Sequence, residues 1–165
     1  MTTIIGIAGS LRTGSLNAAL LRAAVTLMPP GTRLDIASIK GIPLYDGDIE
    51  DHDGIPSLVT ALKNQIAAAD GLLLVTPEYN NAMPGVFKNA IDWLSRPPAD
   101  SARVFGKRKV AVIGASPGGF GTILAQNAWL PVLRTLGMQP WFDGRLMVAR
   151  GGPLRFKFAR VHPAL

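Results

Sequence analysis

The stretch that decides the fold reads GLLLVTPEYNNAMPGVFKNAIDWL and spans residues 71–94. It begins with a continuous apolar run over 71–76, which predicts a strand buried on both faces of a sheet. A loop bounded by Pro77 and Pro84 follows, and Pro84 opens a helix whose inward residues are Phe87, Ala90, Ile91 and Leu94. A buried strand that leads through a loop into a helix is the repeating unit of α/β proteins.

The same unit recurs on both sides of this stretch. Further strands are predicted at 2–9, 33–39, 109–115 and within 138–149. Further helices are predicted from an N-cap at Ser15 to residue 27, over 55–69 and over 122–136, while residues 41–54 are expected to form a loop. The alternation predicts one doubly wound α/β domain with a five-stranded parallel sheet.

Composition limits the kinds of chemistry that the chain can perform. The 165 residues are 48% hydrophobic and 17% charged, which suffices for a sizeable core, and no apolar run is long enough for a membrane span. Cysteine is absent and the only histidines are His52 and His162, which argues against disulfides, thiolate chemistry and a zinc centre. The first ten residues lack the basic start of a signal peptide. We therefore expect a cytoplasmic protein that takes its chemistry from a bound molecule.

Charge patterning argues against two kinds of ligand. The net charge is +6, but residues 150–165 hold four of the 17 basic residues and none of the 11 acidic ones, so the body of the chain is nearly neutral. That distribution, without a nucleic-acid-binding motif, argues against nucleic acid as a partner. The acidic residues of 46–53 lack the ligand spacing and terminal Glu of an EF-hand, so we expect a solvated acidic loop and no metal site.

Three loops that follow predicted strands carry the residues expected to bind a ligand. The first reads GSLRTGSLN over 9–17, and its hydroxyl groups, Asn17 and the Arg12 guanidinium at a helix start suit a phosphate monoester. The second contains PEYN at 77–80, and the third reads ASPGGFG over 115–121. The first loop has neither the Walker nor the dinucleotide-binding spacing. The three loops lie side by side if the strand order is 2-1-3-4-5, which places a ligand at the edge where the strands end.

Together with PGVFKNAIDWLSR at 84–96, these loops resemble the NADPH-dependent FMN reductase family, which includes quinone, chromate and azo-dye reductases. The resemblance covers residues 2–149 and implies a flavodoxin-like fold with FMN as cofactor and NADPH or NADH as hydride donor. It also implies a small-molecule electron acceptor, ping-pong hydride transfer and a homodimer or homotetramer with the flavin near the subunit contact. No catalytic side chain is required, because the flavin carries the redox chemistry.

The resemblance also implies positions for the cofactor. The first loop would hold the FMN phosphate, the second would lie along the ring and ribityl chain, and the third would face the ring from the fourth strand. The residues expected to bind FMN are Ser10, Arg12, Ser15, Leu16, Asn17, Pro77, Glu78, Tyr79, Asn80, Ser116, Pro117, Gly118 and Gly119. For Glu78, a role in an ion pair or a subunit contact stands beside a flavin contact.

Two departures from the family leave other functions open. Thr122-Ile123 stands where the family tends to have a small residue and an Arg. The family's final helix is also missing, so we expect 1–149 to form the FMN-binding domain and 150–165 to form an atypical basic tail. A flavin-binding electron carrier or a non-catalytic binding protein on the same fold is the alternative to an enzyme. A receiver-type signalling domain is rejected, since the first and third strands do not end in acidic residues.

The basic tail carries an expectation of its own. Leu154, Phe156 and Phe158 alternate with basic residues, which is the period of a strand. We expect Phe156 and Phe158 to cover the flank that the missing helix leaves, or a neighbouring subunit. A frayed terminus is the alternative.

Overall fold

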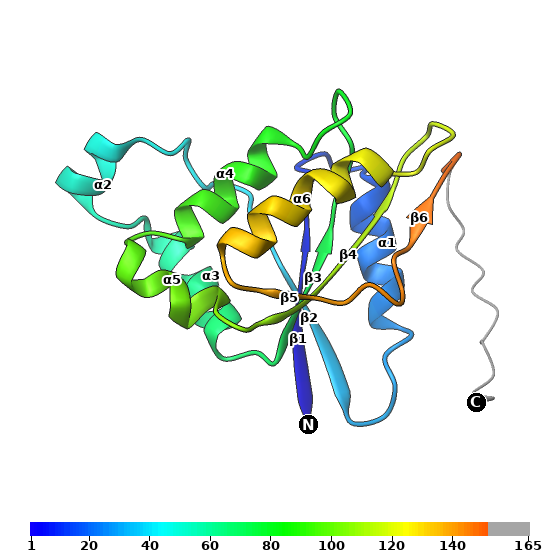
Figure 1. The fold of residues 1–165 in the computed structure, drawn as a ribbon, viewed down its shortest axis with the longest axis horizontal. Coiled ribbons are helices and arrows are strands. Elements are labelled where there is room, and N and C mark those ends of the chain that lie inside the picture. Colours follow the sequence, from blue (N-terminus) through cyan, green and yellow to red (C-terminus); the bar gives the residue numbers. More distant parts are fainter. Residues whose placement is uncertain (152–165) are drawn as a thin grey trace.

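A parallel sheet forms the centre of the computed structural model, which describes residues 1–151 (Figure 1). The expected contacts of Phe156 and Phe158 lie outside these residues. The sheet order is β2-β1-β3-β4-β5 with every pair parallel, which confirms the predicted flavodoxin-like α/β topology. The strands are β1 (Thr2–Ala8), β2 (Thr32–Ala37), β3 (Gly71–Val75), β4 (Lys109–Ala115), β5 (Gln139–Pro140) and β6 (Met147–Val148).

In the described part of the chain, six helices connect the strands, and two of them were not predicted. The helices are α1 (Leu16–Val25), α2 (Gly47–Asp53), α3 (Ser57–Ala67), α4 (Gly85–Leu94), α5 (Pro98–Phe105) and α6 (Ile123–Thr135). The expectation of a loop over 41–54 was wrong, because Asp46 caps the short helix α2 by accepting a hydrogen bond from Asp48 N at 2.9 Å. Helix α5 buries only Val104 and Phe105, too few apolar positions for a helical period to be recognised.

The fifth strand is broken into two short pieces. Both β5 and β6 pair with β4, at its beginning and at its end respectively, so the single strand expected within 138–149 was wrong in detail. Between the pieces, Gly144 lies so close to the Trp141 ring that a Cβ added there would be 2.3 Å from it. Through this packed turn the chain leaves the edge of β4 after β5 and returns to it at β6.

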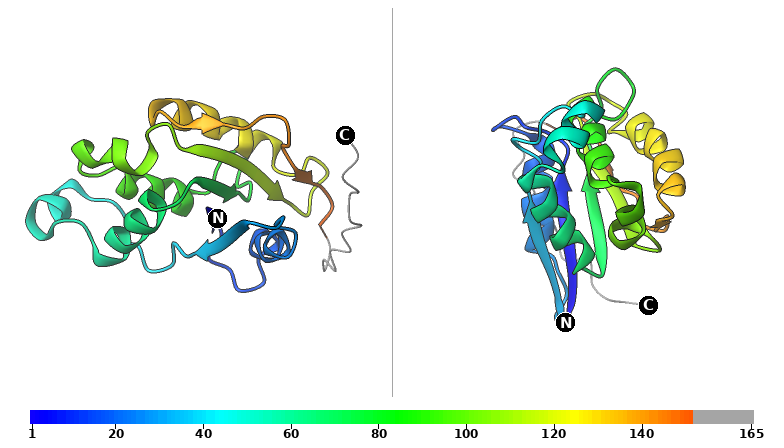
Figure 2. Two further views of the ribbon diagram at one scale, coloured as in Figure 1. Left: turned by 90° about the horizontal axis from the view of Figure 1, so that it is seen from below. Right: turned by 90° about the vertical axis from the view of Figure 1, so that its left-hand side faces the viewer.

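The two faces of the sheet are covered unequally. Helices α3, α4, α5 and α6 share the larger core cluster with one face of the sheet, and the fully buried Trp93 and Trp129 lie in it. Helix α1 contributes Leu20 and Leu21 to the smaller cluster on the opposite face. Figure 1 shows α1 on one side of the strands and α3, α4 and α5 on the other, and Figure 2 shows the layers from two further directions. Within the described residues, no helix has the length and apolar character needed to cross a membrane.

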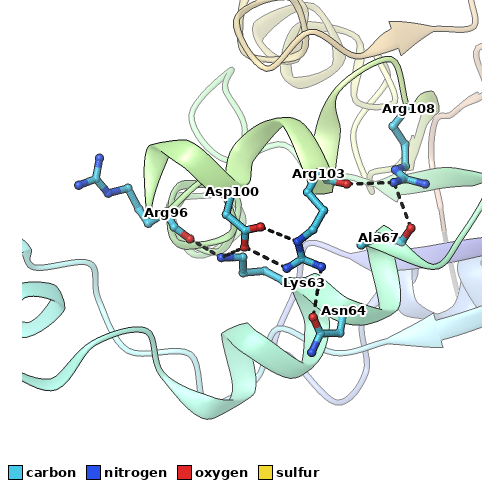
Figure 3. Close-up of polar contacts among 7 residues, drawn as sticks. All are labelled: Lys63, Asn64, Ala67, Arg96, Asp100, Arg103 and Arg108. Atoms are coloured by element: carbon cyan, nitrogen blue, oxygen red, sulfur yellow. Dashed lines mark hydrogen bonds and ion pairs between the residues drawn. The ribbon is translucent and has the colours of Figure 1, made fainter.

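An ion pair between a buried lysine and a partly buried aspartate joins α3 to α5 (Figure 3). The Nζ of Lys63, whose side chain is 4% exposed, lies 2.6 Å from a carboxylate oxygen of Asp100 and also donates to the Arg96 carbonyl. Arg103 holds the same carboxylate through two hydrogen bonds. Hydrogen bonds from Arg103 and from Lys63 lower the pKa of the Asp100 carboxyl below its usual range.

Arg108 satisfies backbone carbonyls at the ends of the same two helices. Its guanidinium donates to the carbonyls of Ala67 and Ala69 at the end of α3 and to those of Arg103 and Val104 in α5. The last carbonyls of a helix have no partner within it, so a cation placed there stabilises both helix ends. Lys63 and Arg108 thus fix α3 and α5 together at the side of the molecule away from the cleft described below.

Replacing Asp100 by Asn should test the ion pair and its pH dependence. Because the folded-state pKa is lowered, the carboxylate stabilises the fold fully above its unfolded-state pKa of about 3.9, and this contribution declines progressively as the pH falls below that value toward the lower folded-state pKa. Asp100→Asn should lower the free energy of unfolding at pH 7 by about 1–3 kcal/mol, since Lys63 keeps a buried charge without its partner. Denaturant unfolding at pH 7 and pH 3 measures the change.

Asp35→Asn is the matched control, because Asp35 pairs with Arg33 in an exposed ion pair. Its effect should stay below about 1 kcal/mol. An Asp100→Asn effect as large at pH 3 as at pH 7 would contradict the assigned role of the carboxylate charge.

Candidate functional site

The three loops predicted from the sequence meet in one cleft at the carboxyl edge of the sheet. The cleft has a volume of about 240 Å³ and is open to solvent. It is lined by ten of the thirteen residues predicted to bind a cofactor, together with Ala115: Ser10, Arg12, Ser15, Leu16, Asn17, Pro77, Glu78, Tyr79, Ser116 and Pro117. Asn80, Gly118 and Gly119 lie in the same loops but are not among the residues that line it.

The first loop presents the start of α1 to the cleft. Ser15 is the N-cap, as predicted, and its Oγ accepts a hydrogen bond from Ala18 N at 3.2 Å. The Ser15 hydroxyl hydrogen stays available for a ligand, because the cap uses only an acceptor lone pair. Arg12 is exposed at the rim. Gly9 precedes them because a Cβ there would lie 2.1 Å from the Phe87 ring of α4.

Asn17 ties α1 to β4 through two hydrogen bonds. Its Nδ2 donates to the Ala115 carbonyl and its Oδ1 accepts from Ala115 N, each at 2.9 Å, and the side chain is buried. This pairing leaves one N–H of the amide for a ligand. Asn17 therefore fixes the distance between the first and third loops.

The second loop is held rigidly at its base and turns sharply at its tip. Thr76 is fully buried, and its hydroxyl donates to the Pro77 carbonyl and accepts from Trp129 Nε1 at 3.1 Å. At the tip, Tyr79 and Ala82 exchange two backbone hydrogen bonds around Asn80-Asn81. Both asparagines have positive φ, of 50° and 63°, as a two-residue hairpin turn of type I′ requires. The turn presents Tyr79 at the cleft, half exposed.

Glu78 clamps the second loop to α6. One oxygen of its carboxylate accepts hydrogen bonds from Leu124 N at 2.9 Å and from Ala125 N at 3.0 Å. The N-cap residue of α6, Thr122, makes no side-chain capping bond, so Glu78 performs that function from 46 residues away. The sequence did not reveal this capping role.

The third loop is supported by the segment that follows β6. Ser116 N donates to Val148 O, Arg150 N donates to Gly118 O at 2.8 Å, and Gly151 N donates to Ser116 O at 2.9 Å. Gly121 closes the loop with a φ of 63° against the backbone of Met147. Nothing in the local sequence of 148–151 pointed to this support, because it depends on how the chain returns to β4.

The electrostatics of the cleft favour an anion at α1. Two helices that follow strands of the central sheet, α1 and α6, begin beside the cleft, and each helix start carries partial positive charge. The Glu78 carboxylate occupies the start of α6, whereas the start of α1 faces Arg12 and the hydroxyls of Ser10 and Ser15. This donor set fits the phosphate of a flavin mononucleotide, and Pro77 and Tyr79 offer apolar surface for a flat ring. Within residues 1–151, no group of three or more His, Asp or Glu side chains is arranged to hold a metal ion.

The chain is similar in sequence to reductases of known description. The profile of the family described as NADPH-dependent FMN reductase matches residues 2–152. A Pseudomonas aeruginosa protein named NAD(P)H-dependent FMN reductase is 46% identical over 146 residues, which are 88% of this chain and 77% of that protein. A Burkholderia protein named 2-hydroxy-1,4-benzoquinone reductase is 48% identical over 121 residues, or 73% of this chain and 64% of that protein.

A solved structure is also similar over most of both chains. The flavoenzyme NAD(P)H:(acceptor) oxidoreductase FerB of Paracoccus denitrificans superposes with a TM-score of 0.83 at 32% sequence identity. The superposition covers 92% of this chain and 81% of FerB.

Removal of the Glu78 carboxylate should loosen the start of α6. Glu78→Ala should lower the free energy of unfolding by about 0.5–2 kcal/mol, the usual cost of losing a helix cap. The amides of Leu124 and Ala125 should exchange with solvent faster, because they lose their acceptor. Hydrogen exchange followed by NMR measures both amides.

Glu78→Gln is the matched variant, since it keeps an acceptor oxygen and should retain part of the protection. Unchanged exchange at Leu124 and Ala125 in Glu78→Ala would contradict the clamp.

Proposed function

Because the chain belongs to the NADPH-dependent FMN reductase family, a family of FMN-dependent enzymes, we propose that it oxidises NADPH or NADH in the cytoplasm and reduces a quinone, a flavin or a similar small acceptor. The acceptor class follows the names of its relatives, which include a benzoquinone reductase.

The observation that carries the proposal is the convergence of three loops in one cleft. Ten of the residues expected to bind FMN come from positions as far apart as Ser10 and Pro117, yet they line a single concave surface. Ligands of doubly wound sheets bind at this edge, outside the carboxyl ends of the strands. The proposed site therefore agrees with the general rule for the fold and with the chemistry of the donors.

Each loop has a separate task in the proposed site. Arg12, Ser10, Ser15 and the first N–H groups of α1 would bind the FMN phosphate as charge-assisted and helix-terminal donors. The second loop would support the ring and ribityl chain with Pro77 and Tyr79. The third loop would close the opposite side, at a distance from the first that Asn17 fixes.

Bound FMN supplies the redox chemistry, since it can accept a hydride from a nicotinamide and deliver two electrons to an acceptor. Over the whole reaction NAD(P)H loses a hydride, and a quinone gains that hydride and a proton from solvent to become a hydroquinone. The protein's part is to hold the ring with one face open, so that the two substrates use that face in turn. No acid or base side chain is assigned.

We also propose that the protein acts as a homodimer or homotetramer. Apolar side chains of the second and third loops and of the start of α6 are exposed: Phe120 is 80% exposed, Tyr79 50% and Leu124 43%. Apolar surface of this kind at the rim of a site is typical of a subunit contact.

Arg12→Ala should weaken FMN binding without affecting riboflavin. Loss of a charge-assisted hydrogen bond costs about 1.5–3 kcal/mol, so the affinity for FMN should fall about tenfold to a hundredfold. Riboflavin lacks the phosphate and should bind as before. Titrations that follow flavin fluorescence measure both affinities, with Arg33→Ala on β2 as the control for general loss of positive charge. Equal losses for both flavins would contradict the phosphate assignment.

Turnover should follow ping-pong kinetics. With FMN bound, initial rates at several concentrations of a soluble quinone should give parallel double-reciprocal lines against NAD(P)H. The lines are parallel because the oxidised nicotinamide leaves before the quinone binds. Intersecting lines would mean that both substrates are bound together. Absence of NAD(P)H oxidation without a partner reductase would favour the electron carrier instead.

A further inference from the structure

A second, wide groove lies away from the FMN cleft, on the sheet face that α1 covers in part. It has a volume of about 850 Å³ and opens over the beginnings of β1, β3, β4 and β5. Its floor and walls include Ile4, Gly71, Ala111, Pro140 and Trp141. The exposed fraction of Trp141 is 55%, in contrast to the fully buried Trp93 and Trp129.

Such a groove is unusual for a parallel sheet, whose faces are both normally covered. Helix α1 packs Leu20 and Leu21 against Val75, Ile113 and Ala115, which lie toward the carboxyl ends of their strands. The amino-terminal half of the same face has no described element over it, so Ile4 stays only partly buried there. The apolar floor thus lacks a partner within residues 1–151.

The described chain ends on this same face of the sheet. Val148 packs against the cluster that contains α1, and Gly151 donates a hydrogen bond to Ser116 O just beyond the end of β4. Figure 1 shows β6 beside α1, on the side of the strands opposite α3, α4 and α5. Residues that follow Gly151 therefore need not cross the sheet or pass around its edge to reach the groove.

The length and pattern of the remaining segment match the groove. From Gly151 to the far end of the groove the chain must run back along β4, whose seven residues span about 23 Å at 3.3 Å per residue. Phe156 and Phe158 follow Gly151 by five and seven residues, which at the same rise reach about 17 and 23 Å. The alternation of Leu154, Phe156 and Phe158 with Arg155 and Lys157 gives one apolar and one cationic side.

We propose that residues 152–165 bind in this groove, with Phe156 and Phe158 against the apolar floor beside Trp141. The cationic side then faces solvent and the Asp70 carboxylate at the rim. The groove is separate from the FMN cleft, so the inference does not depend on the proposed function.

Hydroxyl-radical footprinting read by mass spectrometry tests the inference on the full chain, because it reports the solvent access of each Trp side chain separately. Trp141 should be oxidised more slowly than its 55% exposure predicts. In a chain that ends at Gly151, and in the full-length double variant Phe156→Ser/Phe158→Ser, oxidation of Trp141 should rise severalfold. Trp93 and Trp129 should stay unreactive in all three proteins, which shows that the fold is kept.

A second double variant and a dilution series separate the alternatives. Arg155→Ser/Lys157→Ser changes the cationic side alone and should leave Trp141 protected. Equal oxidation of Trp141 with and without the segment would overturn the proposal. Protection that disappears on dilution would also overturn it, because a second copy of the chain would then be the occupant of the groove. FMN affinity should be the same in every variant.

Discussion

Parallel pairing of β1, β3 and β4 places the ends of all three strands at one edge of the sheet, and every feature of the candidate site depends on this constraint. Each strand continues into a loop that must turn back to a helix, so three loops distant in sequence are forced into contact. Hydrogen bonds then fix their spacing: Asn17 joins the first loop to the end of β4, and Glu78 joins the second loop to α6. The cleft is consequently a property of the sheet as a whole.

The same contacts decide how charge is distributed in the cleft. A helix start attracts anions, and two helix starts lie at this edge. The Glu78 carboxylate accepts hydrogen bonds from the Leu124 and Ala125 N–H groups of α6, and we therefore propose the start of α1, with Arg12 beside it, as the place for a ligand phosphate. In the proposed site, one side chain thus has two effects, since Glu78 holds the second loop against α6 and leaves the first loop as the site for the anion.

The elements with strong local patterns could be predicted from the sequence, and those that depend on distant partners could not. Strand β4 has the predicted bounds, because a short run of apolar residues between charged and glycine-rich segments predicts a buried strand at that place. Helix α5 and the division of the fifth strand escaped prediction, since they are stabilised by packing against Lys63 and by the turn at Trp141. For the site, the loops and their polar residues were visible in the sequence and the resemblance to the FMN reductase family is confirmed. The capping role of Glu78 was not visible, because it requires the position of a helix 46 residues away.

The most direct test of this account is an NMR titration of the apoprotein with FMN, followed through the backbone amides. We predict large shifts at Leu16 and Asn17 at the start of α1, at Tyr79 and at Ser116. The amides of Leu124 and Ala125 should move little, because Glu78 already holds them. Large shifts at Leu124 and Ala125 with none at Leu16 and Asn17 would place the phosphate at the other helix and contradict the account.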